Sequence, residues 1–219
     1  MTKKRLTYIT LLLCIAAFIC QSGCVYYNTF YNAKKAFNKA EKAREKNKYT
    51  SRTGGGQQYK IAIEKALKVI ENNPNTKYYD DALYVVGVSY YYTRQYGKAD
   101  RRFRELLANY TESPYVKESE LYLAKTKLKL REQTQAMELF ENIFNADYEK
   151  SFKAEAAMGL GRYYYENRNI ADAQPYFYAV RDSLGDKIEK KIAQKYIADG
   201  YYALFKFDDA QSAYLQIIG

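Results

Sequence analysis

Four alanines stand 37 residues apart in this chain, and an aromatic residue follows each of them four positions later. The alanines are Ala99, Ala136, Ala173 and Ala210, and the aromatics are Phe103, Phe140, Phe177 and Tyr214. Positions i and i+4 lie on the same face of an α-helix, so each pair predicts a helix with one buried side. A helix pair of this length cannot bury its apolar face alone, so consecutive pairs must stack. The spacing therefore predicts an all-α solenoid of repeated helix pairs.

The partner helix of each pair is marked by a small residue twelve positions before the alanine. These residues are Gly87, Ala124, Gly161 and Ala198. A small side chain lets two helices approach closely. The pattern reaches one step back to Ala62, so residues 59–219 should hold five second helices and at least four complete first helices. Glu120 and Lys127 occupy positions where the repeat prefers bulky apolar residues, which predicts a looser third unit.

The order of small residue, aromatic residue, alanine and phenylalanine resembles the tetratricopeptide repeat, whose common length is about 34 residues. The additional residues fall in the links between repeats. Two of these links, Pro74–Ala82 and Ser113–Tyr115, resemble the connectors of outer-membrane assembly lipoproteins of the BamD (YfiO) type. The resemblance implies a right-handed superhelix of antiparallel helix pairs, whose surface binds partner proteins.

The N-terminus has the order of a secretory signal peptide. Three basic residues precede an apolar run of 15 residues, 6–20, which is short for a membrane span of about 20 residues. Ser22-Gly23-Cys24 then resembles the bacterial lipobox, which implies cleavage before Cys24 and lipid attachment to its sulfur. An uncleaved signal anchor is the alternative. We therefore expect a signal peptide at 1–23, a lipid-anchored basic helix with a Gly-rich loop at 24–58, and the solenoid at 59–219.

The residue after the candidate anchor bears on its destination. Val25 follows Cys24, where the lipoproteins that enteric bacteria retain in the inner membrane carry Asp. The resemblance therefore implies a protein anchored in the outer membrane of the bacterial envelope and facing the periplasm.

The net charge of +10 comes from the first 60 residues. They hold 12 of the 35 Lys and Arg residues but two of the 25 acidic ones, so residues 61–219 carry 23 charges of each sign. A neutral solenoid argues against a nucleic-acid partner. Within the basic segment, Phe30, Ala33, Phe37 and Ala40 recur at helical spacing with lysines on the other faces. We expect an amphipathic helix over 30–48 that either exposes a solvated face or is attracted to anionic lipid headgroups.

Tyrosine is unusually abundant, with 26 residues against no Trp and no His. Tyr91, Tyr165 and Tyr202 recur at the repeat spacing, at a position that faces the concave groove in tetratricopeptide repeats. Aromatic and basic residues at neighbouring positions complete a candidate partner-binding groove: Tyr84, Tyr92, Lys125, Arg162 and Lys195. Tyr and Arg often anchor peptide interfaces. The alternative is that the tyrosines only pack stacked helices together.

The composition offers little chemistry. Without His there is no imidazole metal ligand or acid–base catalyst, and the chain after cleavage would keep only the acylated cysteine. The three glycines at 54–56 lack the Lys-Ser or Lys-Thr that completes a phosphate loop, so they predict a flexible loop. We expect no catalytic, cofactor or metal site.

The sequence therefore favours an envelope scaffold that binds peptide segments or partner subunits, most specifically in the assembly of outer-membrane proteins. A scaffold of another envelope machine, such as pilus or secretion-system assembly or cell-division coordination, is the first alternative. The second is the non-catalytic part of a longer envelope enzyme. The final helix reaches residue 219 with no polar cap after it, so we expect more chain or a partner to cover that end.

Overall fold

The computed structural model describes residues 28–46, 54–74 and 76–218, and every regular element in these ranges is a helix. The predicted signal peptide, Cys24 and the loop residues 47–53 lie outside the described residues. The predicted all-α class is confirmed. The helix after the Gly-rich loop begins at Gly56, slightly before the solenoid boundary expected at Tyr59.

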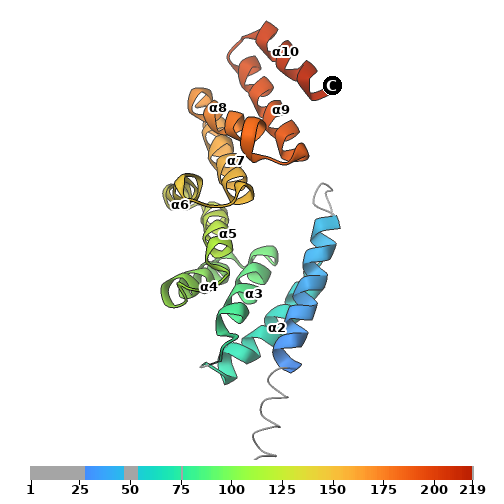
Figure 1. Cartoon of the computed structure of the whole chain (residues 1–219), viewed down its shortest axis with the longest axis vertical. Coiled ribbons are helices and arrows are strands. Elements are labelled where there is room, and N and C mark those ends of the chain that lie inside the picture. Colours follow the sequence, from blue (N-terminus) through green and yellow to red (C-terminus); the bar gives the residue numbers. More distant parts are fainter. Residues whose placement is uncertain (1–27, 47–53, 75, 219) are drawn as a thin grey trace, which may run out of the picture. The chain divides into compact units, whose positions relative to one another are not determined.

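The helices follow one another along the chain with short turns between them (Figure 1). The first helix is described over residues 28–46. It is followed by α2 Gly56–Asn72, α3 Tyr79–Tyr92, α4 Tyr96–Asn109, α5 Val116–Lys129, α6 Gln133–Asn145, α7 Lys150–Glu166, α8 Ile170–Ala179, the π-helical turn η1 Val180–Leu184, α9 Lys187–Ala203 and α10 Phe207–Ile218. The acidic residues at 80–81 and 208–209 stand in the first turns of α3 and α10, where the helix dipole favours negative charge.

The chain divides into two compact units, one ending at Leu106 and one beginning at Leu107. In the first unit, the first helix packs through Phe37, whose ring lies edge-on to Tyr59 of α2 at 6.3 Å and to Tyr84 of α3 at 6.0 Å. The Tyr59 hydroxyl donates a hydrogen bond to Glu41 of the first helix. The first helix and α2 thus form a pair that precedes the repeats with the full pattern.

In the second unit, each helix packs against the next one from α5 to α10. The first helices of consecutive pairs also touch, α5 with α7 and α7 with α9. This is nearest-neighbour stacking, in which a repeat is stabilised by the repeats on either side. The predicted stacking of helix pairs is therefore present within the second unit.

The aromatic residues that define the repeat form its core. Phe103, Phe140 and Phe177 are fully buried, as are the alanines one turn before them. A Cβ atom added to Gly161 would lie 2.7 Å from the Phe177 ring, and one added to Gly87 would lie 2.7 Å from the Phe103 ring. Glycine is therefore required at these two positions of the first helices, because the aromatic ring of the second helix fills the place of a Cβ atom.

The turn inside each of four repeats has the same backbone geometry. Arg94, Arg131, Arg168 and Phe205 all have φ near +60°, and they stand 37 residues apart. In each turn the residue after the left-handed one donates to the carbonyl five positions back, as from Gln95 N to Tyr90 O at 2.9 Å. The left-handed residue donates three positions back, as from Arg94 N to Tyr91 O at 3.0 Å. This is the Schellman arrangement, in which the left-handed position usually carries glycine.

Glu120 and Lys127, the polar residues at positions where the repeat prefers apolar ones, both have hydrogen-bond partners. The Nζ atom of the buried Lys127 lies 2.6 Å from a carboxylate oxygen of Glu132. The hydroxyl of Tyr148 donates to Glu120 at 2.6 Å, and burial together with this bond raises the pKa of Tyr148 to about 12. Each polar group is therefore satisfied, and the α5–α6 pair keeps a continuous core around Phe140.

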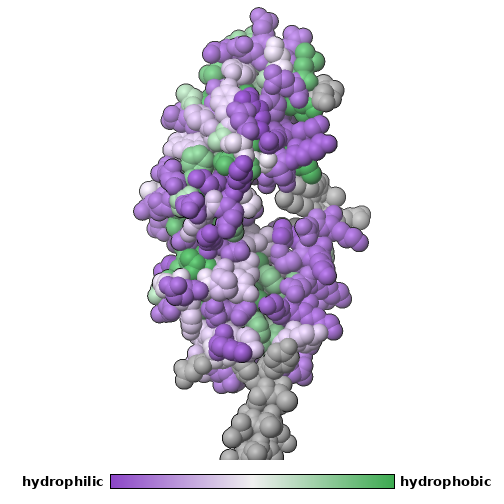
Figure 2. All heavy atoms as spheres, in the orientation of Figure 1, coloured by the Kyte–Doolittle hydropathy of each residue, from purple (hydrophilic) through white to green (hydrophobic). Residues whose placement is uncertain are grey.

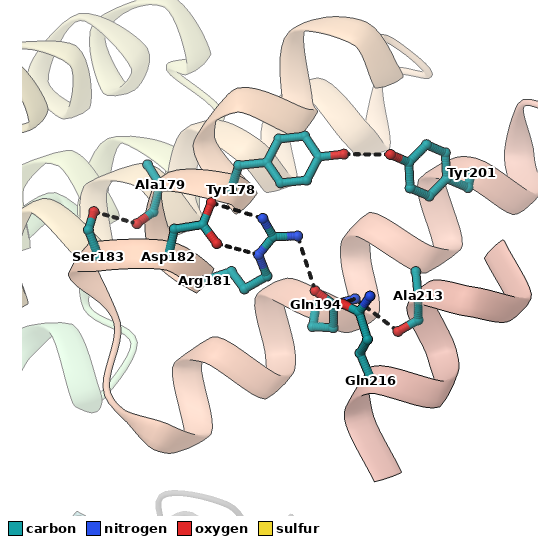
Figure 3. Close-up of polar contacts among 9 residues, drawn as sticks. All are labelled: Tyr178, Ala179, Arg181, Asp182, Ser183, Gln194, Tyr201, Ala213 and Gln216. Carbon is teal, nitrogen blue, oxygen red and sulfur yellow. Dashed lines mark hydrogen bonds and ion pairs between the residues drawn. The ribbon is translucent and has the colours of Figure 1, made fainter. Parts of the chain in front are cut away.

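A polar network connects η1, α9 and α10 (Figure 3). The guanidinium of Arg181 in η1 binds Asp182, with Nε at 2.5 Å from the carboxylate, and extends toward Gln194 of α9. The buried Gln194 amide donates to the carbonyl oxygen of Ala213 in α10 at 2.9 Å. Asp186 caps α9 by accepting from the Glu189 backbone N–H at 2.8 Å. These bonds position α9 between η1 and α10.

We predict that Gly161→Ala lowers the unfolding free energy by about 1–2 kcal/mol, because the new methyl group overlaps the buried Phe177 ring. The control is Gly97→Ala in α4, where an added Cβ meets nothing within 4 Å. Removing a glycine from an open helix position should raise stability by about 0.5–1 kcal/mol. Urea unfolding followed by circular dichroism measures both variants. Equal effects of the two would contradict the packing account.

We predict that Arg131→Gly raises the unfolding free energy by about 0.5–1 kcal/mol, because glycine adopts the left-handed conformation without the steric cost that arginine bears. Arg131→Ala is the matched control, since it removes the same exposed side chain and keeps the backbone cost. Thermal unfolding of the two variants measures the difference. If Arg131→Gly and Arg131→Ala are stabilised equally, the effect comes from loss of the arginine side chain and not from the backbone conformation of the turn.

Candidate partner-binding surface

The predicted groove residues fall on first helices of the repeats, in both units. Tyr84, Tyr91 and Tyr92 lie on α3 in the first unit. The other five lie in the second unit, Lys125 on α5, Arg162 and Tyr165 on α7, and Lys195 and Tyr202 on α9.

The α3 tyrosines take part in packing within the first unit. Tyr92 stacks on the buried ring of Tyr59, with centroids 5.0 Å apart, and the Arg44 guanidinium lies 5.1 Å above the Tyr92 ring. Tyr84 contacts Phe37, and Tyr91 is edge-on to Tyr96 at 5.7 Å. All three rings are half-buried. These contacts agree with the alternative reading of the tyrosines as packing residues.

Two of the predicted cations in the second unit are paired with carboxylates. Lys125 forms an ion pair with Glu155 of α7. The Nζ atom of Lys195 lies 2.6 Å from Asp199, and this hydrogen bond raises the pKa of Lys195. The same Asp199 accepts a bond of 2.6 Å from the Tyr214 hydroxyl, which together with burial raises the pKa of Tyr214 to about 12. Their positive charges are therefore locally compensated.

Arg162 differs from these lysines. Its side chain is exposed, and its guanidinium carbon lies 5.7 Å from the centre of the Tyr196 ring on α9. Among the described residues no carboxylate forms an ion pair with it. An exposed arginine above an aromatic ring keeps its hydrogen-bond donors available to a carboxylate of another molecule.

Tyr196 is the residue that organises this surface, and the sequence did not indicate it. Its ring stacks on the buried Phe177 at 4.7 Å and lies edge-on to Tyr165 at 5.4 Å. Burial raises the pKa of Tyr165. We name the α7–α9 surface by its five residues: Arg162, Tyr165, Lys195, Tyr196 and Asp199. It combines aromatic rings with one available cation.

A second feature lies at the turn between α9 and α10. Four exposed apolar side chains gather there, and we call them the aromatic turn: Tyr202, Leu204, Phe205 and Phe207. Phe205 is 80% exposed and Tyr202 is 61% exposed. The Phe207 ring is edge-on to Tyr202 at 5.5 Å and to Phe205 at 6.2 Å. Figure 2 shows a mostly hydrophilic face with small groups of hydrophobic atoms.

The aromatic turn differs from the equivalent turns of the earlier repeats in the residue at the left-handed position. The left-handed position holds an exposed arginine in the three earlier turns and a phenylalanine in this one. A bulky aromatic residue in this conformation is a steric outlier. Only Tyr202 of the four residues was predicted from the sequence. The earlier turns have Arg-Gln, Arg-Glu and Arg-Asn at the positions of Phe205-Lys206, so the change from arginine to phenylalanine could have indicated the aromatic turn.

The described residues contain no cluster of three or more His, Cys, Asp or Glu side chains that could hold a metal ion. Within the same residues, no helix has the length and apolar character needed to cross a membrane.

No protein-family model and no curated protein matches this sequence. Several solved structures match the fold. MamA is 18% identical with a TM-score of 0.58, over 74% of this chain and 88% of MamA. BtubC from P. vanneervenii is 15% identical with a TM-score of 0.60, over 86% of this chain and 89% of BtubC. A kinesin-light-chain protein of Podosopora anserina, with nearly identical TPR-like repeats, is 17% identical with a TM-score of 0.59, over 84% and 94% of the two chains. The chain therefore has a tetratricopeptide-like repeat fold, as its 37-residue spacing predicts.

Proposed function

We propose that this protein is a lipid-anchored scaffold of the bacterial cell envelope and that it binds a segment of a partner protein. The observation that carries the proposal is the α7–α9 surface, where the exposed Arg162 lies above Tyr196 beside Tyr165. Its neighbouring lysines are neutralised, so recognition depends on one arginine and two rings. Repeat folds of this kind act through such surfaces and commonly lack a catalytic centre.

The chemistry of the surface indicates what it would bind. A guanidinium can hold a carboxylate through two parallel hydrogen bonds, and tyrosine rings offer rigid apolar area at low entropic cost. The exposed rings of the aromatic turn extend the apolar area at the end of α9. We therefore propose an extended or helical segment with an acidic or C-terminal carboxylate group and an aromatic or aliphatic side chain.

The cellular process is proposed from the sequence. The basic start, the apolar run and Ser22-Gly23-Cys24 support a lipid anchor, and Val25 supports the outer membrane as its destination. The links Pro74–Ala82 and Ser113–Tyr115 resemble those of lipoproteins that assemble outer-membrane β-barrels, which is the process we propose. The structural neighbours support the scaffold class and leave the process to the experiments below.

We predict that Arg162→Ala weakens partner binding by about 1–2 kcal/mol, a rise in Kd of about 5- to 30-fold. The partner is identified first, by a photo-crosslinking residue at Tyr202 in intact cells, and is then titrated against the purified chain. Arg101→Ala is the matched control, because Arg101 is an exposed arginine on α4.

The same titration separates binding from folding. Tyr165→Ala should also weaken binding, whereas its thermal unfolding should change less than that of Phe177→Ala, because Tyr165 is half-buried and Phe177 is fully buried. If Arg162→Ala and Arg101→Ala bind the partner alike, the α7–α9 surface is not its binding site. If Tyr165→Ala mainly loses stability and the folded fraction binds normally, the tyrosines are packing residues.

We predict that Cys24→Ala abolishes fatty-acid labelling and leaves an unprocessed or soluble form, because the acylated sulfur is the proposed anchor. Radiolabelled palmitate incorporation and membrane fractionation measure the two effects. Ser22→Ala serves as a control, since it keeps a small residue before the cysteine. A wild-type chain without the label, together with unchanged fractionation of Cys24→Ala, would contradict the lipoprotein assignment.

A further inference from the structure

The first helix carries an exposed basic stripe that none of the packing described above uses. Its buried face is formed by Phe30, Ala33, Phe37 and Ala40. The opposite side is exposed and carries four lysines and one tyrosine: Tyr31, Lys35, Lys39, Lys42 and Lys46. At 3.6 residues per turn these five side chains fall within about 80° of arc, and they extend over about 22 Å of helix.

The lysines of this stripe differ from the other cations of the same helix. Arg44 is 2.7 Å from Glu41, and Lys34 lies 3.9 Å from Asp81 of α3. Within the described residues, no carboxylate forms an ion pair with Lys35, Lys39, Lys42 or Lys46. Glu45 is the exposed acidic residue nearest to them along the helix. The stripe therefore carries uncompensated positive charge.

The charge is also local in the sequence. Residues 61–219 carry equal numbers of basic and acidic residues, so the repeats do not extend the basic field. A long polyanion would need basic residues along the repeats, and these are balanced by acidic residues. One short basic helix can instead bind an anionic surface that contacts this helix alone. Tyr31, which is 52% exposed, stands at the start of the stripe. Tyrosine rings are favoured at the level of lipid headgroups.

We propose that the basic stripe lies flat on anionic phospholipid headgroups of the membrane in which the protein is anchored. The described part of the helix starts at residue 28, so the stripe lies close in sequence to Cys24. The inference rests on the proposed anchoring at Cys24 only for delivery of the helix to the membrane. The stripe then directs α2 and α3 away from the membrane, because these helices pack on the opposite face of the first helix.

The test uses the full mature chain carrying Cys24→Ser, so that no lipid anchor contributes to binding. Co-sedimentation with vesicles of phosphatidylcholine containing about 30% phosphatidylglycerol should show binding at 0.05 M salt and loss at 0.5 M salt, as screening shortens the reach of the charges. Vesicles of phosphatidylcholine alone should bind at least tenfold less.

A charge-matched pair of variants locates the contact. K35Q/K39Q/K42Q/K46Q should reduce partitioning onto the anionic vesicles by about 1,000-fold, because each lysine near the surface contributes separately. K129Q/K150Q/K187Q/K206Q removes four exposed lysines from the repeats and should change it less than threefold. All eight side chains are exposed, so circular dichroism should report unchanged folding for both variants.

Three outcomes would overturn the proposal. Equal losses in the two quadruple variants would mean that only net charge matters. Equal binding to the neutral vesicles would exclude headgroup charge as the cause. Displacement by inorganic phosphate beyond that by chloride of the same ionic strength would assign the lysines to a small-anion site. Because Cys24 is absent throughout, each result is independent of whether the natural chain is acylated and of whether Arg162 binds a partner.

Discussion

The close contact between a buried aromatic ring of one helix and a small residue of its partner helix is the interaction on which the repeats depend, and in two repeats the small residue is glycine. Phe177 of α8 occupies the space that a Cβ on Gly161 of α7 would need, and Phe103 does the same at Gly87. Burying such a ring contributes about 1.5–3 kcal/mol, provided that the two helices approach closely enough to exclude water. The contact also sets which faces of the paired helices meet. Everything on the outer faces is then free to vary without cost to the core.

The exposed residue at the left-handed position of the turns varies between repeats. Four turns share one backbone geometry, yet three expose an arginine and the last exposes Phe205. Side chains at the left-handed position cost about 1–2 kcal/mol, and this cost is present in all four turns. The aromatic residue adds exposed apolar area to that cost, and its ring contacts Phe207, which is itself exposed. Exposed apolar side chains that lie together often mark interaction sites, which is why the aromatic turn belongs with the candidate binding surface.

Ion pairing separates the cations into two classes. Lys125, Lys195 and Arg44 have carboxylate partners, so their charge contributes little beyond the molecule. Arg162 and the lysines of the basic stripe have no such partner among the described residues. The two unpaired groups lie on different kinds of surface, one rich in aromatic rings and one formed mostly by lysines. This difference suits a protein segment at the first and lipid headgroups at the second.

The sequence by itself determined the helical class, the period and the core, because a buried face must recur with the helical repeat. Ala136, Phe140 and Ile143 could be assigned to the interior for that reason, and they are buried. It also placed Arg162 and Tyr165 on one helix face. The signal peptide and the anchor at Cys24 remain sequence predictions, since those residues lie outside the described ranges.

Tertiary structure decided which of the exposed groups are available. Lys125 and Arg162 look alike in the sequence, but Glu155 neutralises the first, and the ring of Tyr196 lies under the second. Tyr92 and Tyr202 both belong to the tyrosine-rich ends of first helices, yet Tyr92 stacks on Tyr59 while Tyr202 is exposed. These outcomes depend on side chains brought together from separate helices. Periodicity assigns a residue to a face of its own helix, whereas only the packing of neighbouring helices determines what lies against that face.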